Sequence, residues 1–146
     1  MNKKICLFTA LIFFALVLSS CNTDLSYAPY AVKSKTVRIG SYSSYYNFAG
    51  AHIVFSNKSN KVVRQVTLSF LVFDSDGQLS SPVGNAIVTV HTEKIKPLDS
   101  KEIIVSLDDA LGPHLFKTYQ VGNLFASEIV FSDGSVWSDP MGFYAE

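Results

Sequence analysis

The sequence predicts an all-β fold, a two-layer antiparallel β-sandwich of about seven strands. Short runs of alternating apolar and polar residues follow one another between turn residues, and no long helical stripe appears after residue 35. The chain has 146 residues, of which 48% are hydrophobic and 13% aromatic, enough for one domain with its own core. A small β-barrel is the alternative, because strand register is not visible in a sequence.

Residues 1–20 are predicted to be a secretory signal. Lys3 and Lys4 form a basic start, and the apolar run at 5–18 is shorter than the roughly 20 residues that cross a bilayer as a helix. The run ends in Leu18-Ser19-Ser20-Cys21, which resembles the bacterial lipobox. The resemblance implies that Cys21 receives a diacylglyceryl group and becomes the lipid-anchored, palmitate-bearing N-terminus. The alternatives are an ordinary secreted protein and an uncleaved apolar anchor.

The cysteine count agrees with lipidation. Cys6 lies inside the predicted signal, so Cys21 is the one cysteine left after processing and no intramolecular disulfide is possible. A free thiol in an oxidising compartment is reactive unless its sulfur is already consumed. Asn22 follows the cysteine, where Asp marks inner-membrane retention in well-studied Gram-negative bacteria. The lipobox resemblance therefore favours the outer membrane or the cell surface.

Residues 21–35 are predicted to be the lipidated cysteine and a flexible tether, because they are mixed, polar and broken by Pro29. Residues 36–146 are predicted to form the sandwich. Strands are expected at 36–42, 51–56, 62–74, 86–94, 103–107, 119–131 and 136–137.

The clearest strand is 62–74, in which apolar and polar residues alternate. It should run through the core. Polar turns are expected at 57–60 and 74–77, and a hairpin turn at 132–135. Alternating runs of this kind favour an immunoglobulin-like sandwich, here without the cysteine pair of antibody domains.

One stretch of the sequence resembles a known family. Residues 70–74, Phe-Leu-Val-Phe-Asp, follow the Asn-rich turn 56–63 and precede Ser75-Asp76-Gly77. This pattern is similar to the FxLYD type of bacterial extracellular domain, with Val72 in the Leu position and Phe73 in the Tyr position. The resemblance implies an immunoglobulin-like domain often found in lipoproteins, with no catalytic residues to carry over.

The composition argues against several functions. Removing Lys3 and Lys4 from equal totals of 12 basic and 12 acidic residues leaves a nearly neutral chain without a basic stripe, so nucleic acid binding is not expected. The sequence has no nucleophile elbow, phosphate-binding glycine loop or zinc-protease motif. His52, His91 and His114 are spaced unlike metal ligands and are expected at the surface or at strand edges. No metal site, cofactor or enzymatic activity is predicted.

The aromatic residues Tyr42, Tyr45, Tyr46 and Trp137 are the predicted contact residues. Exposed aromatic rings bind proteins and glycans at low entropic cost; the alternative is that these rings cover a sandwich edge or the sheet surface. The predicted function is a non-enzymatic envelope lipoprotein that binds a protein or glycan partner. The alternatives are a structural or accessory subunit of an envelope complex and a hydrolase with an unrecognised site.

Overall fold

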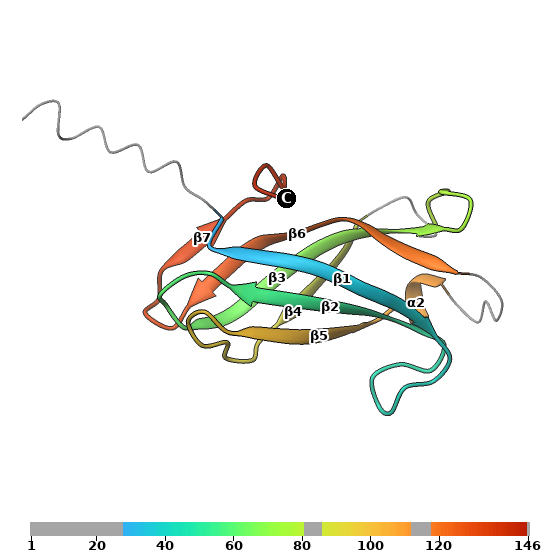
Figure 1. Ribbon diagram of the computed structural model, residues 1–146, viewed down its shortest axis with the longest axis horizontal. Coiled ribbons are helices and arrows are strands. Elements are labelled where there is room, and N and C mark those ends of the chain that lie inside the picture. The colour runs from blue at the N-terminus through green and yellow to red at the C-terminus, as the bar shows by residue number, and fades with distance from the viewer. Residues whose placement is uncertain (1–27, 81–85, 112–117, 146) are drawn as a thin grey trace, which may run out of the picture.

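The structure, a computed structural model, describes residues 28–80, 86–111 and 118–145 and contains two antiparallel sheets (Figure 1). The first sheet has the order β1-β2-β5, with β1 (Tyr30–Ile39), β2 (Ala49–Asn57) and β5 (Ser100–Ser106). The second has the order β4-β3-β6-β7, with β4 (Ile87–His91), β3 (Val63–Asp74), β6 (Tyr119–Phe131) and β7 (Val136–Ser138). The short helix α2 (Asp108–Leu111) follows β5.

These strands confirm the predicted β-sandwich. The alternative of a small closed barrel is wrong, because β1 and β5 end one sheet while β4 and β7 end the other. With the strands taken in chain order, the fourth strand pairs with the third, whereas in immunoglobulin constant domains it joins the sheet of the first, second and fifth.

The core lies between the two sheets and follows the strand period of two. In β3, the prediction of a core strand is confirmed, because Val66, Leu68, Phe70 and Val72 are completely buried. Across the core, β2 contributes every second residue from Ala51 through Ile53 to Phe55. The two central strands thus bury regular apolar faces against each other.

The first strand begins earlier than predicted. β1 starts at Tyr30, so the prediction that the flexible tether extends to residue 35 is wrong for residues 30–35. The Tyr30 ring is buried and stacks on Phe55 at 5.9 Å, and its hydroxyl accepts a hydrogen bond from the Ala126 amide at 3.0 Å. β1 is an edge strand, where polar and charged residues are tolerated, and this hides its pattern in the sequence.

The predicted signal, the lipobox and Cys21 lie outside the described residues. Within the part of the chain that the structure describes, no helix is long and apolar enough to cross a membrane.

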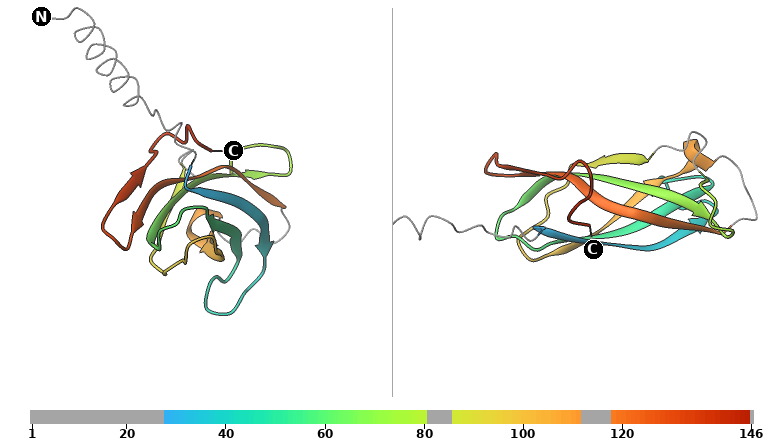
Figure 2. Two further views of the ribbon diagram at one scale, coloured as in Figure 1. Left: turned by 60° about the vertical axis from the view of Figure 1, so that its left-hand side comes forward. Right: turned by 90° about the horizontal axis from the view of Figure 1, so that it is seen from above.

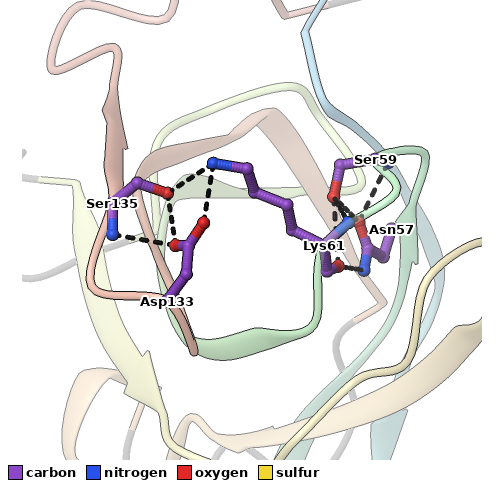
Figure 3. A network of polar contacts seen from close by, with 5 residues as sticks. All are labelled: Asn57, Ser59, Lys61, Asp133 and Ser135. Atoms are coloured by element: carbon purple, nitrogen blue, oxygen red, sulfur yellow. Dashed lines mark hydrogen bonds and ion pairs between the residues drawn. The ribbon is translucent and has the colours of Figure 1, made fainter.

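A polar network ties together the turns at the end of the sandwich where β1 begins (Figure 3). Asn57 is 1% exposed, and its side-chain amide donates to the carbonyl groups of Lys61, Ile95 and Lys96 at 2.8, 3.3 and 3.0 Å. Lys61 Nζ lies 2.8 Å from Asp133 Oδ2 in the hairpin between β6 and β7.

The three predicted turns are confirmed. In the turn after β3, Asp74 Oδ1 accepts hydrogen bonds from the amides of Asp76 and Gln78 at 3.0 and 2.9 Å. In the hairpin between β6 and β7, Gly134 adopts a positive φ of 85° that favours glycine. The polar turn after β2 is held by the Asn57 side chain, whose Oδ1 accepts a hydrogen bond from the Ser59 amide at 3.0 Å.

Replacing Phe70 tests the core. Phe70→Ala should lower the free energy of unfolding by about 3–5 kcal/mol, because it removes a fully buried ring and leaves a cavity. Chemical denaturation measures this change. Val88→Ala on β4 is the matched control, since Val88 is 63% exposed, and it should shift stability by less than about 0.5 kcal/mol. Equal effects of the two substitutions would contradict this core.

Candidate functional site

The candidate site is the loop of residues 40–48 that joins β1 to β2, called here the aromatic loop. It projects from the end of the sandwich opposite the start of β1 (Figure 1). The structure divides the three predicted tyrosines. Tyr42 is 40% and Tyr45 is 55% exposed, whereas Tyr46 is only 3% exposed. Phe48, which sequence reasoning missed, adds a further exposed ring.

A tight turn orders the exposed part of the loop. The Tyr42 amide donates to the Tyr46 carbonyl at 3.0 Å, and the Tyr45 amide donates to the Tyr42 carbonyl at 3.1 Å. The Tyr42 and Tyr45 rings stack at 6.0 Å, and the Arg38 guanidinium lies 5.8 Å from the Tyr42 ring. Rings already held in one arrangement lose little freedom on binding, so this loop is suited to contact a partner.

Tyr46 anchors the loop to the outer face of the first sheet. Its hydroxyl lies 3.1 Å from His52 Nε2, and His52 Nδ1 lies 3.4 Å from Glu102 Oε1. The predicted surface or edge position of His52 is wrong, because the side chain is 1% exposed beneath the rings of Tyr42 and Tyr46. Tyr46 was predicted as a contact residue, but its burial gives it a supporting role instead.

Glycine at position 50 makes room for this anchor. A Cβ atom on Gly50 would overlap the Tyr46 ring. The ring therefore lies directly over the backbone of β2, where any side chain would displace it. The pair of Gly50 and Tyr46 explains why the loop folds back onto the sheet.

Asp108, at the start of α2, holds the other side of the loop. Its carboxylate accepts hydrogen bonds from the amides of Asn47, Phe48 and Ala49 at 2.7, 2.8 and 3.0 Å. Desolvation raises the pKa of this carboxyl, but the hydrogen bonds from these amides and from Ser106 outweigh it, so the pKa is lowered. An aspartate some 60 residues away along the chain thus supplies the acceptor that the loop amides lack.

The arrangement of Tyr46, His52 and Glu102 brings a hydroxyl, an imidazole and a carboxylate together. Burial raises the pKa of the Tyr46 hydroxyl, and the Arg38 guanidinium only partly opposes this effect. A raised pKa favours the neutral hydroxyl, which can form a hydrogen bond with His52. The geometry fits a role in fixing the loop.

Of the other two histidines, the structure describes His91. His91 Nε2 lies 3.4 Å from Glu93 Oε2, and burial together with Lys101 lowers the His91 pKa. His114 lies outside the described residues. Among residues 28–80, 86–111 and 118–145, no group of three or more His, Cys, Asp or Glu side chains could hold a metal ion.

Trp137 does not join the tyrosines. Its ring contacts Tyr30 at 5.3 Å and Tyr144 at 6.0 Å, both with edge-to-face geometry. Tyr30 is the first residue of β1, whereas the aromatic loop follows the last residue of β1. The length of β1 therefore separates Trp137 from the tyrosines of the loop. The predicted contact residues therefore belong to two surfaces.

The comparisons with known proteins bear on the fold. Neither a family model nor a curated protein matches the sequence. A crystal structure of a hypothetical protein from Peptoclostridium difficile 630 is similar, with a TM-score of 0.53 and 10% identity over 78% of this chain and 88% of that chain. The structural genomics target SoR45 has a TM-score of 0.41 and 13% identity over 75% of this chain and 79% of that chain. The first likeness shows the fold alone, and the FxLYD resemblance stays a prediction.

Replacing Asp108 tests how the loop is held. Asp108→Asn should lower the free energy of unfolding by about 2 kcal/mol. The substitution replaces the carboxylate, which accepts three amide hydrogen bonds, with a neutral amide that has only one acceptor oxygen. Asp109→Asn is the matched control, since Asp109 is the exposed neighbour on the same helix.

The same variant has a defined pH dependence. The pKa of Asp108 is lowered in the folded state from its ordinary value of 3.8, so its contribution to stability is complete well above pH 3.8. This contribution is lost as the pH falls through the lowered pKa. Acid denaturation should therefore show a smaller pH dependence in Asp108→Asn than in the wild type, and identical profiles would contradict the assignment.

Proposed function

We propose that the chain is a lipid-anchored bacterial envelope protein that binds a protein or glycan partner through the aromatic loop, without catalysis. The observation that carries this proposal is the exposure of Tyr42, Tyr45 and Phe48 on a loop that Asp108 holds in place. Large exposed rings with a fixed backbone are typical of contact surfaces.

The position of the loop fits a tethered protein. β1 runs from the end of the domain that the predicted tether enters to the aromatic loop. Its 10 residues span roughly 33 Å. A lipid on Cys21 would therefore hold the start of β1 near the bilayer and leave the loop facing away from it. Asn22 favours the outer membrane or the cell surface as the location.

The chemistry of the loop suits partners that present flat apolar faces bordered by polar groups. Tyrosine rings combine an apolar face with a hydroxyl group, so they stack on sugar rings and on peptide groups. Arg38 beside Tyr42 adds a hydrogen-bond donor group with five N–H bonds. The resemblance to FxLYD-type extracellular domains supports a binding module over an enzyme.

A structural or accessory subunit is the second candidate, and one observation favours it. Val88 and Val90 are 63% and 55% exposed on β4, an edge strand of the four-stranded sheet. An apolar sheet edge can accept a strand from another protein. Size-exclusion chromatography of detergent-extracted native protein separates the candidates, since a monomer-sized peak argues against the subunit.

Replacing Cys21 tests the anchor. Cys21→Ala should abolish palmitate labelling and should remove the protein from the membrane fraction, because the acyl chains supply the anchoring free energy. Radiolabelled palmitate and membrane fractionation are the measurements. Persistence of either in the variant would overturn the proposed lipid anchor.

Replacing the exposed tyrosines tests the contact surface. The double variant Tyr42→Ala and Tyr45→Ala should weaken capture of the partner about tenfold or more in crosslinking in native cells, because the rings supply the contact area. Its thermal midpoint should stay within a few degrees of the wild type. The matched control replaces Val88 and Val90 with Ala. Loss of the partner in the control alone would favour the accessory subunit.

A further inference from the structure

We propose that the C-terminal segment forms a second membrane contact, in which Met141, Phe143 and Tyr144 lie against the lipid surface beside the anchor. These three residues are called here the proximal patch. This inference rests on the proposed lipid anchor and adds an orientation of the domain on the bilayer.

The patch gathers unusually exposed apolar side chains. Phe143 is 82%, Met141 71% and Tyr144 45% exposed, all within residues 141–144. Soluble domains seldom leave several large apolar residues exposed together unless another surface covers them. Exposure of this kind indicates an interaction site.

The segment that carries the patch is held in a fixed shape. Asp139 is 3% exposed, and its carboxylate accepts hydrogen bonds from the amides of Phe143 and Tyr144 at 3.0 and 2.9 Å. The Asp139 amide donates to the Ser127 carbonyl of β6 at 2.9 Å. The backbone thus folds back on Asp139 and presents the side chains of Phe143 and Tyr144 outward.

The patch lies where the predicted tether enters the domain. The C-terminal segment lies beside the start of β1 in both rotated views (Figure 2). Trp137 forms the link, because its ring contacts Tyr30 at 5.3 Å on one side and Tyr144 at 6.0 Å on the other. The exposed residue Lys58 lies next to the start of β1, because its backbone amide donates a hydrogen bond to the Pro29 carbonyl at 2.8 Å.

Chain length limits the distance between this end and the bilayer. Residues 22–27 separate Cys21 from the described part of the domain, and a fully extended chain of this length reaches at most about 25 Å. A lipid on Cys21 therefore keeps the patch within reach of the lipid surface whatever the conformation of the tether. A lipid surface is therefore the occupant that the tether brings to the patch.

The side chains also have the right chemistry. Aromatic rings with one polar group concentrate at the level of lipid headgroups, and phenylalanine and methionine enter the acyl boundary below it. Lys58 can face anionic headgroups, while the Asp139 carboxylate is buried and occupied by amides. The contact would orient the long axis of β1 and keep the aromatic loop away from the membrane.

Single-tryptophan reporters test this inference, because Trp137 is the one tryptophan of the chain. The variant with Trp137→Phe and Phe143→Trp places the indole in the patch. The matched control with Trp137→Phe and Tyr45→Trp places it in the aromatic loop. Both new positions are exposed, so folding should be preserved, and circular dichroism checks it. The lipidated full chain is reconstituted into vesicles of phosphatidylethanolamine and phosphatidylglycerol, with or without bromine on the acyl chains.

We expect brominated lipid to quench the indole at position 143 strongly and the indole at position 45 hardly at all, since an interfacial contact lies about 5–10 Å deep. Vesicle-bound protein with no quenching at position 143 would overturn the patch while leaving the anchor intact. Equal quenching at both positions would overturn the proposed orientation. A dimer in crosslinking without quenching would assign the patch to a second copy of the chain. Absence of palmitate and of vesicle binding in the wild type would instead show that the anchor itself fails.

Discussion

The sandwich depends on the burial of apolar side chains between its two sheets, because residues 28–145 contain no cysteine that could cross-link them. Phe55 of β2 and Phe70 of β3 lie completely buried in this interior. Each such side chain contributes roughly 1.5–3 kcal/mol relative to an exposed one. Because the inward-facing side chains of β3 recur at every second residue from Val66 to Val72, a shift of one residue in its register would turn them away from the core, so this interior also fixes the strand register.

Outside the strands, backbone amide and carbonyl groups have no neighbouring strand to pair with. Side chains of Asp and Asn form hydrogen bonds with them instead. Asp108 accepts three amides of the aromatic loop, and Asp139 accepts two amides of the C-terminal segment. Asn57 donates to three carbonyl groups at the turns where β1 begins. Backbone groups outside the ladders need such partners, and Asp108 and Asp139 also each fix a segment that carries exposed aromatic rings. The same polar side chains that satisfy the backbone therefore preserve the two candidate contact surfaces.

The sequence was sufficient for features that depend on neighbouring residues. The alternation in β3 and the Asp-Gly turns around Gly77 and Gly134 are local patterns, and the structure confirms them. The start of β1 was not predictable, because Tyr30 is buried by Phe55 and Ala126, which are distant in the sequence.

The candidate site was predicted only in part for the same reason. The residue types were right, but no local pattern distinguishes exposed Tyr45 from buried Tyr46, whose position depends on Gly50 and His52. The role of Asp108 in the loop requires a contact across about 60 residues. A partial signal was present in the glycine that follows the tyrosines, since glycine inside a strand marks a close approach.

The direct connection of the tether side to the aromatic loop by β1 has a mechanical consequence. Under the proposed function, a partner on the loop would pull against the lipid anchor at the N-terminus, and the tension would run along the covalent backbone from Tyr30 to Ile39. The hydrogen bonds between β1 and β2 lie across this load path and need not carry it, because the two attachment points lie at opposite ends of the same strand. A force between the proposed anchor and the proposed partner would thus pass mainly through β1.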